Sequence, residues 1–312
     1  MRVLFMGTPD FALFSLKALV ESGEEVIGVV TQPDKPKGRG KAMSAPPVKV
    51  YAEEIGLPVY QPSTMRDEAF WPTLCELDPE LIVVTAYGKI LPKYILDYPR
   101  YGCLNVHGSL LPAYRGAAPM QRAVMEGCTE TGVTIMYMDV GLDTGDMLLK
   151  KVLPLRENDN FEDVHDGLGV LGADALLEAI ALIKAGNAPR EKQDEARATY
   201  AAKITKEDCH VQFALPARML HNRIRGLSPI PLCFVTTRDG KMLKIVETRV
   251  GSLTSTASPG TVLGLSDGDE SGILVSTGEG SILLLRVVPE GKKPMDALSF
   301  ANGRGLRVGD LL

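Results

Sequence analysis

The chain has 312 residues, of which 45% are hydrophobic and 23% are charged, and its formal net charge is −5 at pH 7. These proportions are ordinary for a folded globular protein and exclude a disordered chain or a collagen-like repeat. No apolar run approaches the roughly 20 residues that span a bilayer, no signal peptide is expected, and five scattered cysteines without a Cys-x-x-Cys pair predict a protein of the reducing cytoplasm.

Strand and helix patterns alternate as far as residue 185. Short apolar runs predict strands at 3–6, 26–30, 59, 81–85, 103–107, 133–138 and 147–153. Helical spacing predicts a helix capped by Thr8 and opened by Pro9, and further helices at 48–56, 67–77, 117–126 and 160–185. This alternation predicts an α/β fold, a doubly wound and mainly parallel Rossmann-like sheet.

A basic segment interrupts the alternation early. Residues 31–47 are rich in Pro, Gly and Lys, and we expect them to form no regular structure. The stretch 35–52 has no acidic residue and contains the cations Lys35, Lys37, Arg39, Lys41 and Lys49. An ordinary solvated surface loop is one interpretation. The alternative is a functional loop, because long irregular insertions in compact domains are often functional.

The last third of the chain changes character. Residues 189–206 are polar and predict a linker with some helix, followed by a helix at 216–225. Five short β runs then occur at 232–237, 243–250, 261–265, 273–277 and 282–288, with a hairpin turn at Asp239-Gly240 between the first two. Short strands with glycine turns predict a small OB-like β-barrel. We therefore expect domains at 1–188 and 207–312, joined by the linker 189–206.

Two segments carry side chains suited to acyl chemistry. Asn105 and His107 lie at the end of the predicted strand 103–107 and, two residues apart, share one face of it. An amide can donate to a developing oxyanion, and an imidazole can hold or move a proton. A lone Asn-x-His pair is nevertheless more often a structural feature than a catalytic one.

The second segment is a loop with three carboxylates, Asp139, Asp143 and Asp146. One of them could orient His107 or relay a proton through water. A solvated turn is the alternative, whereas the spacing does not match a calcium-binding EF-hand. The four histidines show no metal-ligand spacing, and Gly7-Thr8-Pro9 lacks the G-x-G-x-x-G pattern of dinucleotide sites.

Taken together, these motifs resemble the folate-dependent formyltransferases over nearly the whole chain. They are GTPDFA at 7–12, TQPDKPKGRGK at 31–41, NVHGSLLPAYRGAAPMQRAVMEG at 105–127, GLDTGD at 141–146 and GKKPMDALSFANG at 291–303. One departure stands out: after Pro229-Ile230-Pro231 the family usually has Gly-Ala, and this chain has Leu232-Cys233.

The resemblance implies roles for individual residues. Asn105, His107 and Asp143 would be the catalytic trio. The folate site would be formed by Ser109, Leu110, Leu111, Pro112, Tyr87, Gly88 and Val140. The loop that meets the acceptor end of a tRNA would contribute Lys35, Lys37, Arg39 and Lys41. A second basic set in the OB-like domain would contain Arg218, His221, Arg223, Arg225, Lys292 and Lys293, although each alone is more simply an ordinary surface charge.

The resemblance also implies a reaction. Residues 1–188 would form the catalytic domain and 207–312 a tRNA-binding domain. The co-substrate would be 10-formyltetrahydrofolate, without a metal, and the acceptor would be the α-amine of initiator methionyl-tRNA, in a cytoplasmic monomer with no membrane partner. The alternatives are a formyltransferase acting on a sugar amine or other small amine, a hydrolase that releases formate, and a non-catalytic tRNA-binding protein.

Overall fold

The chain forms two compact units in a computed structural model that describes residues 1–37, 42–267 and 270–312. Unit 1 comprises Met1–Gly116, Glu130–Pro154 and His165–Tyr200, and unit 2 comprises Ala117–Thr129, Leu155–Val164 and Ala201–Leu312. The expected domains at 1–188 and 207–312 remain a prediction, because these two units are each assembled from separate segments of the chain. None of the helices in the described ranges has the length and apolar character needed to cross a membrane.

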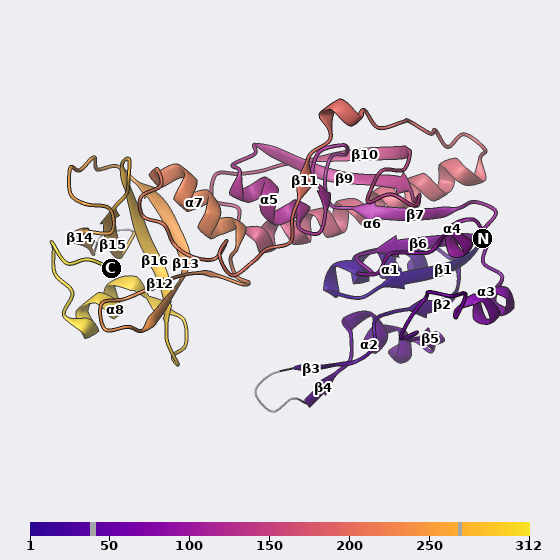
Figure 1. The fold of residues 1–312 in the computed structure, drawn as a ribbon, viewed down its shortest axis with the longest axis horizontal. Helices are drawn as coiled ribbons and strands as arrows, with labels where there is room; N and C mark the ends of the chain where they lie inside the picture. The colour runs from indigo at the N-terminus through magenta and orange to yellow at the C-terminus, as the bar shows by residue number, and fades with distance from the viewer. Residues whose placement is uncertain (38–41, 268–269) are drawn as a thin grey trace. The chain divides into compact units, whose positions relative to one another are not determined.

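Unit 1 is built on a seven-stranded sheet in the order β10-β9-β7-β6-β1-β2-β5 (Figure 1). Its strands are β1 (Arg2–Gly7), β2 (Glu25–Val30), β5 (Val59–Tyr60), β6 (Leu81–Thr85), β7 (Cys103–His107), β9 (Glu130–Tyr137) and β10 (Met147–Pro154). The five strands from β7 to β5 pair in parallel, whereas β9 and β10 pair antiparallel. The predicted α/β class and mainly parallel sheet are therefore confirmed.

Helices pack against both faces of this sheet. They are α1 (Asp10–Glu21), α2 (Pro47–Glu54), α3 (Trp71–Leu77), α4 (Lys93–Leu96) and α6 (Phe161–Lys184). α6 approaches β7 closely, because a Cβ on Gly172 would lie 3.0 Å from Cγ1 of Val106. On the opposite face, Cys103 packs in one apolar cluster with Ile95 of α4. Since side chains alternate along a strand, Asn105 and His107 share the face of Cys103.

Two local predictions in unit 1 are wrong. The residue that caps α1 is Pro9 and not Thr8, whose hydroxyl instead donates to the carbonyl of Tyr87 at 3.0 Å. The basic segment is not wholly irregular either, because β3 (Lys35–Lys37) and β4 (Ala42–Ser44) pair antiparallel. A ladder of backbone hydrogen bonds pairs the main chain of these two strands, although the sequence there has no apolar periodicity.

Unit 1 also contains β8 (Arg115–Gly116) and η1 (Glu195–Arg197), and β11 (Tyr200–Ala201) lies at the point where the two units meet in sequence.

Unit 2 contains a six-stranded antiparallel sheet, consistent with the predicted small barrel. Its strands are β12 (Cys233–Thr236), β13 (Met242–Gly251), β14 (Val262–Ser266), β15 (Gly272–Ser276), β16 (Ser281–Pro289) and β17 (Met295–Asp296). Its helices are α5 (Pro119–Met125), α7 (Ala217–Gly226) and α8 (Ala297–Arg304). Buried side chains of α7, α8 and the strands form one core, which includes Leu220, Ile224, Ile245, Val275 and Phe300. All five predicted strands are present, whereas β17 and α8 were not predicted.

Candidate active site

Strand β7 supplies the first two residues of the site. Asn105 pairs with Met136 of β9 and His107 pairs with Thr134, so the pair is held in a ladder at the middle of the sheet. His107 is 6% exposed and Asn105 is half-buried. Their side chains are thus fixed on one face by strand geometry.

The third residue comes from the loop that follows β9. Because β9 runs antiparallel to β7, this loop leaves the sheet beside the start of β7, where the amide of Met138 donates to the carbonyl of Cys103 at 2.8 Å. The loop therefore begins beside the start of β7 and not beside the end of β7 that carries His107. The loop instead folds back over the sheet, with Asp143 in the left-handed region at φ +54°. Gly145 permits that fold, because a Cβ there would collide with the carbonyl oxygen of Tyr137.

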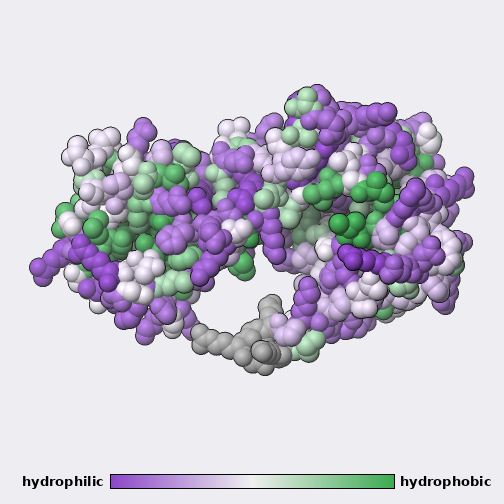
Figure 2. All heavy atoms as spheres, viewed as in Figure 1, coloured by the Kyte–Doolittle hydropathy of each residue, from purple (hydrophilic) through white to green (hydrophobic). Residues whose placement is uncertain are grey.

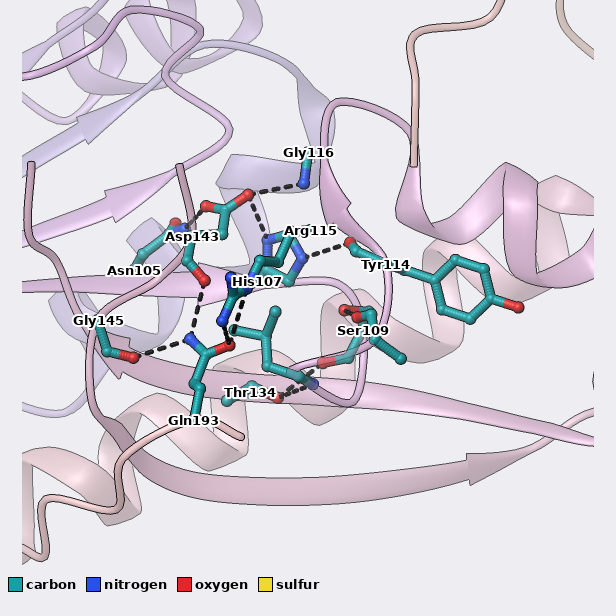
Figure 3. Close-up of polar contacts among 12 residues, drawn as sticks. Asn105, His107, Ser109, Tyr114, Arg115, Gly116, Thr134, Asp143, Gly145 and Gln193 are labelled. Atoms are coloured by element: carbon teal, nitrogen blue, oxygen red, sulfur yellow. Dashed lines mark hydrogen bonds and ion pairs between the residues drawn. The ribbon is translucent and has the colours of Figure 1, made fainter. Parts of the chain in front are cut away.

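The loop brings the predicted trio together (Figure 3). The Asp143 carboxylate lies 3.5 Å from Asn105 Nδ2 through Oδ1 and 3.7 Å from His107 Nδ1 through Oδ2. The backbone N–H of Gly116 donates to the same Oδ2 at 2.8 Å and fixes the carboxylate. The three side chains therefore lie close together, although Asn105 and Asp143 are 38 residues apart in sequence. Their catalytic roles stay a prediction.

The partners of His107 define which nitrogen carries a proton. Nε2 lies 3.0 Å from the carbonyl oxygen of Tyr114, which can only accept, so Nε2 carries hydrogen. Nδ1 faces the Asp143 carboxylate, and a second proton there would also meet an acceptor. The two ring nitrogens of His107 therefore each face an oxygen that can accept a hydrogen bond.

A polar chain that the sequence analysis did not identify supports the Asp143 loop. Gln193 Nε2 donates to the carbonyls of Asp143 and Gly145, both at 2.8 Å. Arg115, which is fully buried, donates to Gln193 Oε1 and to the Glu195 carboxylate. The hydrogen bond to Arg115 lowers the pKa of Glu195, and the same bond raises the pKa of Arg115. Arg115 is inside a quoted motif, but no local pattern marks Gln193 within the predicted linker.

The motif residues after His107 form a rigid turn. Ser109 Oγ donates to the carbonyl of Ala113 at 2.6 Å, and Thr134 Oγ1 donates to the carbonyl of Ser109 at 2.7 Å. Thr134 Oγ1 also accepts from the amide of Leu111, whose side chain packs with Met136 and Met147. The predicted folate roles of Ser109, Leu110, Leu111 and Pro112 stay a prediction.

The other predicted folate residues differ in exposure. Tyr87 is buried, and this burial raises its pKa to about 12, so its phenol stays protonated at neutral pH. Gly88 has φ +80°. Val140 is 73% exposed and Leu142 is 58% exposed, and both precede Asp143 in sequence. Figure 2 shows apolar side chains on the visible face of unit 1 as well. Exposed apolar side chains beside a polar trio suit a flat heterocycle such as a pterin.

The predicted basic residues separate into three groups. Lys35 is exposed, Lys37 belongs to β3, and Arg39 and Lys41 lie outside the described residues. On α7, the cations are used inside unit 2: Arg218 pairs with Glu157, Arg223 donates to the carbonyl of Asp208, and His221 and Arg225 are buried. Lys292 and Lys293 are exposed.

In the part of the chain that the structure describes, no group of three or more His, Cys, Asp or Glu is placed to hold a metal.

Comparison with known proteins identifies the family. The model "Formyl transferase" matches residues 1–180, and "Formyl transferase, C-terminal domain" matches residues 203–305. The "Methionyl-tRNA formyltransferase" of Geotalea daltonii is 47% identical over 309 residues, which are 99% of this chain and 97% of the relative. That of Desulforamulus reducens is 47% identical over 313 residues, covering 100% of this chain and 98% of the relative.

Solved structures share the fold at low sequence identity. The sugar 3N-formyl transferase WlaRD, solved in the presence of dTDP and 5-N-formyl-THF, has a TM-score of 0.65 at 17% identity and covers 94% of this chain and 99% of its own. HypX from Aquifex aeolicus, in complex with tetrahydrofolic acid, has a TM-score of 0.65 at 16% identity over 100% of this chain and 49% of its own. The chain belongs to the formyl transferase family and, within it, to the branch represented by the methionyl-tRNA formyltransferases.

Proposed function

We propose that this enzyme transfers the formyl group of 10-formyltetrahydrofolate to the α-amine of initiator methionyl-tRNA. The observation that carries the proposal is the convergence of Asn105, His107 and Asp143 on one face of the sheet, in a chain that is 47% identical to methionyl-tRNA formyltransferases over its whole length. We further propose that it acts in the cytoplasm and as a monomer.

Asn105 would stabilise the oxyanion that develops when the amine attacks the formyl carbon. Its amide nitrogen has two hydrogens, and the contact that it makes with Asp143 is long, at 3.5 Å. A donor is therefore available to the carbonyl oxygen of the formyl group. Losing one such donor typically lowers the rate by about 100- to 1000-fold.

His107 and Asp143 would manage charge and protons together. As the new C–N bond forms, the attacking amine loses a proton, and the folate nitrogen gains one as its bond to the formyl carbon breaks. The Asp143 carboxylate can accept the first proton and His107 Nδ1 can share it, because 3.7 Å separates the two groups. The Gly116 amide keeps Oδ2 in place during this exchange.

Exposed side chains support the folate and tRNA contacts. The exposed Val140 and Leu142 side chains, next to Asp143 in sequence, suit an apolar ring system. For tRNA, the support is the exposed Lys35 and the run of cations that continues through Lys37, Arg39 and Lys41. Contacts to phosphates predict a tRNA affinity that falls steeply with salt and is weakened in Arg39→Ala.

A formylation assay tests the proposal directly. The purified enzyme is incubated with 10-formyltetrahydrofolate and either initiator methionyl-tRNA, a dTDP-amino sugar or no acceptor. We expect formylmethionyl-tRNA in the first reaction and neither a formylated sugar nor free formate in the others. Formylation of the sugar alone would establish the small-amine alternative, and formate release without acceptor would establish a hydrolase.

A further inference from the structure

We propose that Gln193 is a positioning residue for Asp143, and that the segment 191–199 supports both halves of the active site. This inference rests on the proposed function for its meaning in catalysis. Gln193 lies outside the residues matched by either family model and within the stretch predicted as a linker. Its side chain nevertheless contacts the loop that carries Asp143 (Figure 3).

The contacts of Gln193 bracket the backbone of Asp143. The two hydrogens of Nε2 reach the carbonyls of residues 143 and 145, each at 2.8 Å. Asp143 has φ +54°, a conformation that L-residues rarely adopt and that the surroundings must hold. Two hydrogen bonds on either side of Thr144 therefore restrain the peptide units that set the direction of the Asp143 side chain.

Arg115 fixes the orientation of the Gln193 amide. Its Nε and Nη2 donate to Gln193 Oε1 at 3.0 Å and 2.9 Å. If the amide were flipped, its NH₂ group would face guanidinium donors and its oxygen would face two carbonyls, so neither side could bond. Arg115 is fully buried, and the Glu195 carboxylate binds it through two oxygens at 2.9 Å and 2.7 Å. The buried charge is thereby neutralised by a bidentate pair.

The same segment is anchored at both ends to the site. At one end, Glu191 and Met147 exchange backbone hydrogen bonds of 2.9 Å and 2.8 Å, where β10 begins. At the other end, Thr199 Oγ1 accepts from the amide of Tyr114 at 2.8 Å. The carbonyl of Tyr114 is the partner of His107 Nε2. One segment therefore restrains the backbone next to both Asp143 and the acceptor of His107.

The decisive variant is Gln193→Glu, which keeps the acceptor for Arg115 and replaces the two donors by an oxygen. Gln193→Met removes the donors without adding a charge, and Lys192→Ala, an exposed neighbour, is the control. We expect kcat to fall by about 10- to 100-fold in both Gln193 variants, because misplacing a catalytic group by about 1 Å can cost about 100-fold. KM for both substrates should change less than about threefold, since the substrate contacts remain.

Two further readouts separate positioning from general damage. In an Asp143→Ala background, Gln193→Glu should lower kcat no further, because its effect acts through Asp143. The same fractional loss in both backgrounds would overturn the proposal, as would an unchanged kcat. Hydrogen exchange of residues 139–147 should accelerate in Gln193→Glu and not in Lys192→Ala. This last measurement tests the restraint of the loop even if the wild-type enzyme formylates no methionyl-tRNA, and unchanged exchange would also overturn the proposal.

Discussion

Each unit of the molecule buries a histidine, and the two histidines have different surroundings. His107 in unit 1 faces the Asp143 carboxylate and a backbone carbonyl. His221 in unit 2 is 1% exposed and faces the Thr248 hydroxyl at 2.9 Å and the carbonyl of Glu157 at 3.3 Å. Burial lowers the pKa of His221 to about 4, so this ring is neutral at pH 7. The comparison teaches that burial alone does not distinguish the two histidines, and that the facing carboxylate is what sets His107 apart as a candidate for proton transfer.

The largest expected effect is a difference in kcat between variants of the site in unit 1 and a variant of the buried histidine in unit 2. Asn105→Ala and Asp143→Ala should each lower kcat by at least about 100-fold, because each removes a group that faces the reacting carbon in the proposed reaction. His221→Gln should leave kcat within about threefold. Steady-state formylation of methionyl-tRNA measures all three, with circular dichroism to show that the variants are folded. Wild-type turnover in either of the first two variants would remove that residue from the trio.

A second test compares the carboxylate of the site with one that holds the structure. Asp208 in unit 2 accepts two hydrogen bonds from Arg122 at 2.9 Å and 2.8 Å, and this pairing lowers its pKa to about 2 from 3.8. A carboxylate with a lowered folded pKa stabilises the fold above its unfolded pKa, and the contribution is lost as the pH falls through the folded value. Asp208→Asn should therefore cost about 2.5 kcal/mol of unfolding free energy at pH 7, and the cost should shrink between pH 4 and pH 2. Urea denaturation at several pH values measures it, and a cost independent of pH would contradict the assignment.

A third test uses His221, whose burial disfavours the charged form of the ring, whereas Arg122 stabilises the charged form of Asp208. Its folded pKa is lowered from 6.5 to about 4, so the unfolded chain takes up a proton below pH 6.5 while the folded chain does not. The fold should thus lose about 2 kcal/mol from this group between pH 7 and pH 5. In His221→Gln that loss should be absent, which a comparison of denaturation curves at the two pH values detects. Equal pH dependence in both proteins would show that His221 titrates normally.

The smallest expected effect concerns Leu232, the residue at which this chain departs from the family pattern. It has φ +74°, in a region where a side chain costs about 1–2 kcal/mol and glycine costs little. Leu232→Ala keeps that strain and Leu232→Gly relieves it, so the glycine variant should be about 1 kcal/mol more stable than the alanine variant. Thermal unfolding of the pair decides the point. The usual order, alanine above glycine, would show that the backbone relaxes at this position.

Most of the fold and the pair Asn105 and His107 were accessible from the sequence for physical reasons, whereas the family resemblance singled out Asp143 from the three carboxylates of its loop. Apolar runs bounded by turns located the strands, and Asn105 and His107 had to share a face because the strand period is two. The antiparallel direction of β9 could not be predicted, because direction depends on pairing across the sheet and leaves no mark in the strand itself. Helix α8 had usable signals, since Asp296 caps its start and Gly305 ends it with φ +65°, but its apolar residues show little periodicity.

The supporting residues were harder to predict for a different reason. Gln193 reaches Asp143 across 50 residues of chain, and its contact is to backbone carbonyls, which every residue has. Such a contact imposes no complementary residue type on its partner, and no spacing rule records it. The predicted catalytic trio was recognisable because its members lie within the motifs that resemble the family, whereas the residues that hold a trio in place are known only from the folded chain.

The absence of room at Gly145 has a consequence for redesign of this enzyme. Any Cβ at that position meets the main chain of Tyr137, while Val140 and Leu142, a few residues earlier, extend into solvent. The loop thus has no space for a side chain at position 145 and leaves the side chains at positions 140 and 142 in solvent. A mutant library that seeks new ligands should randomise positions 140 and 142 together and leave Gly145 fixed. Any side chain at position 145 would collide with the main chain of Tyr137 and displace the loop that carries Asp143.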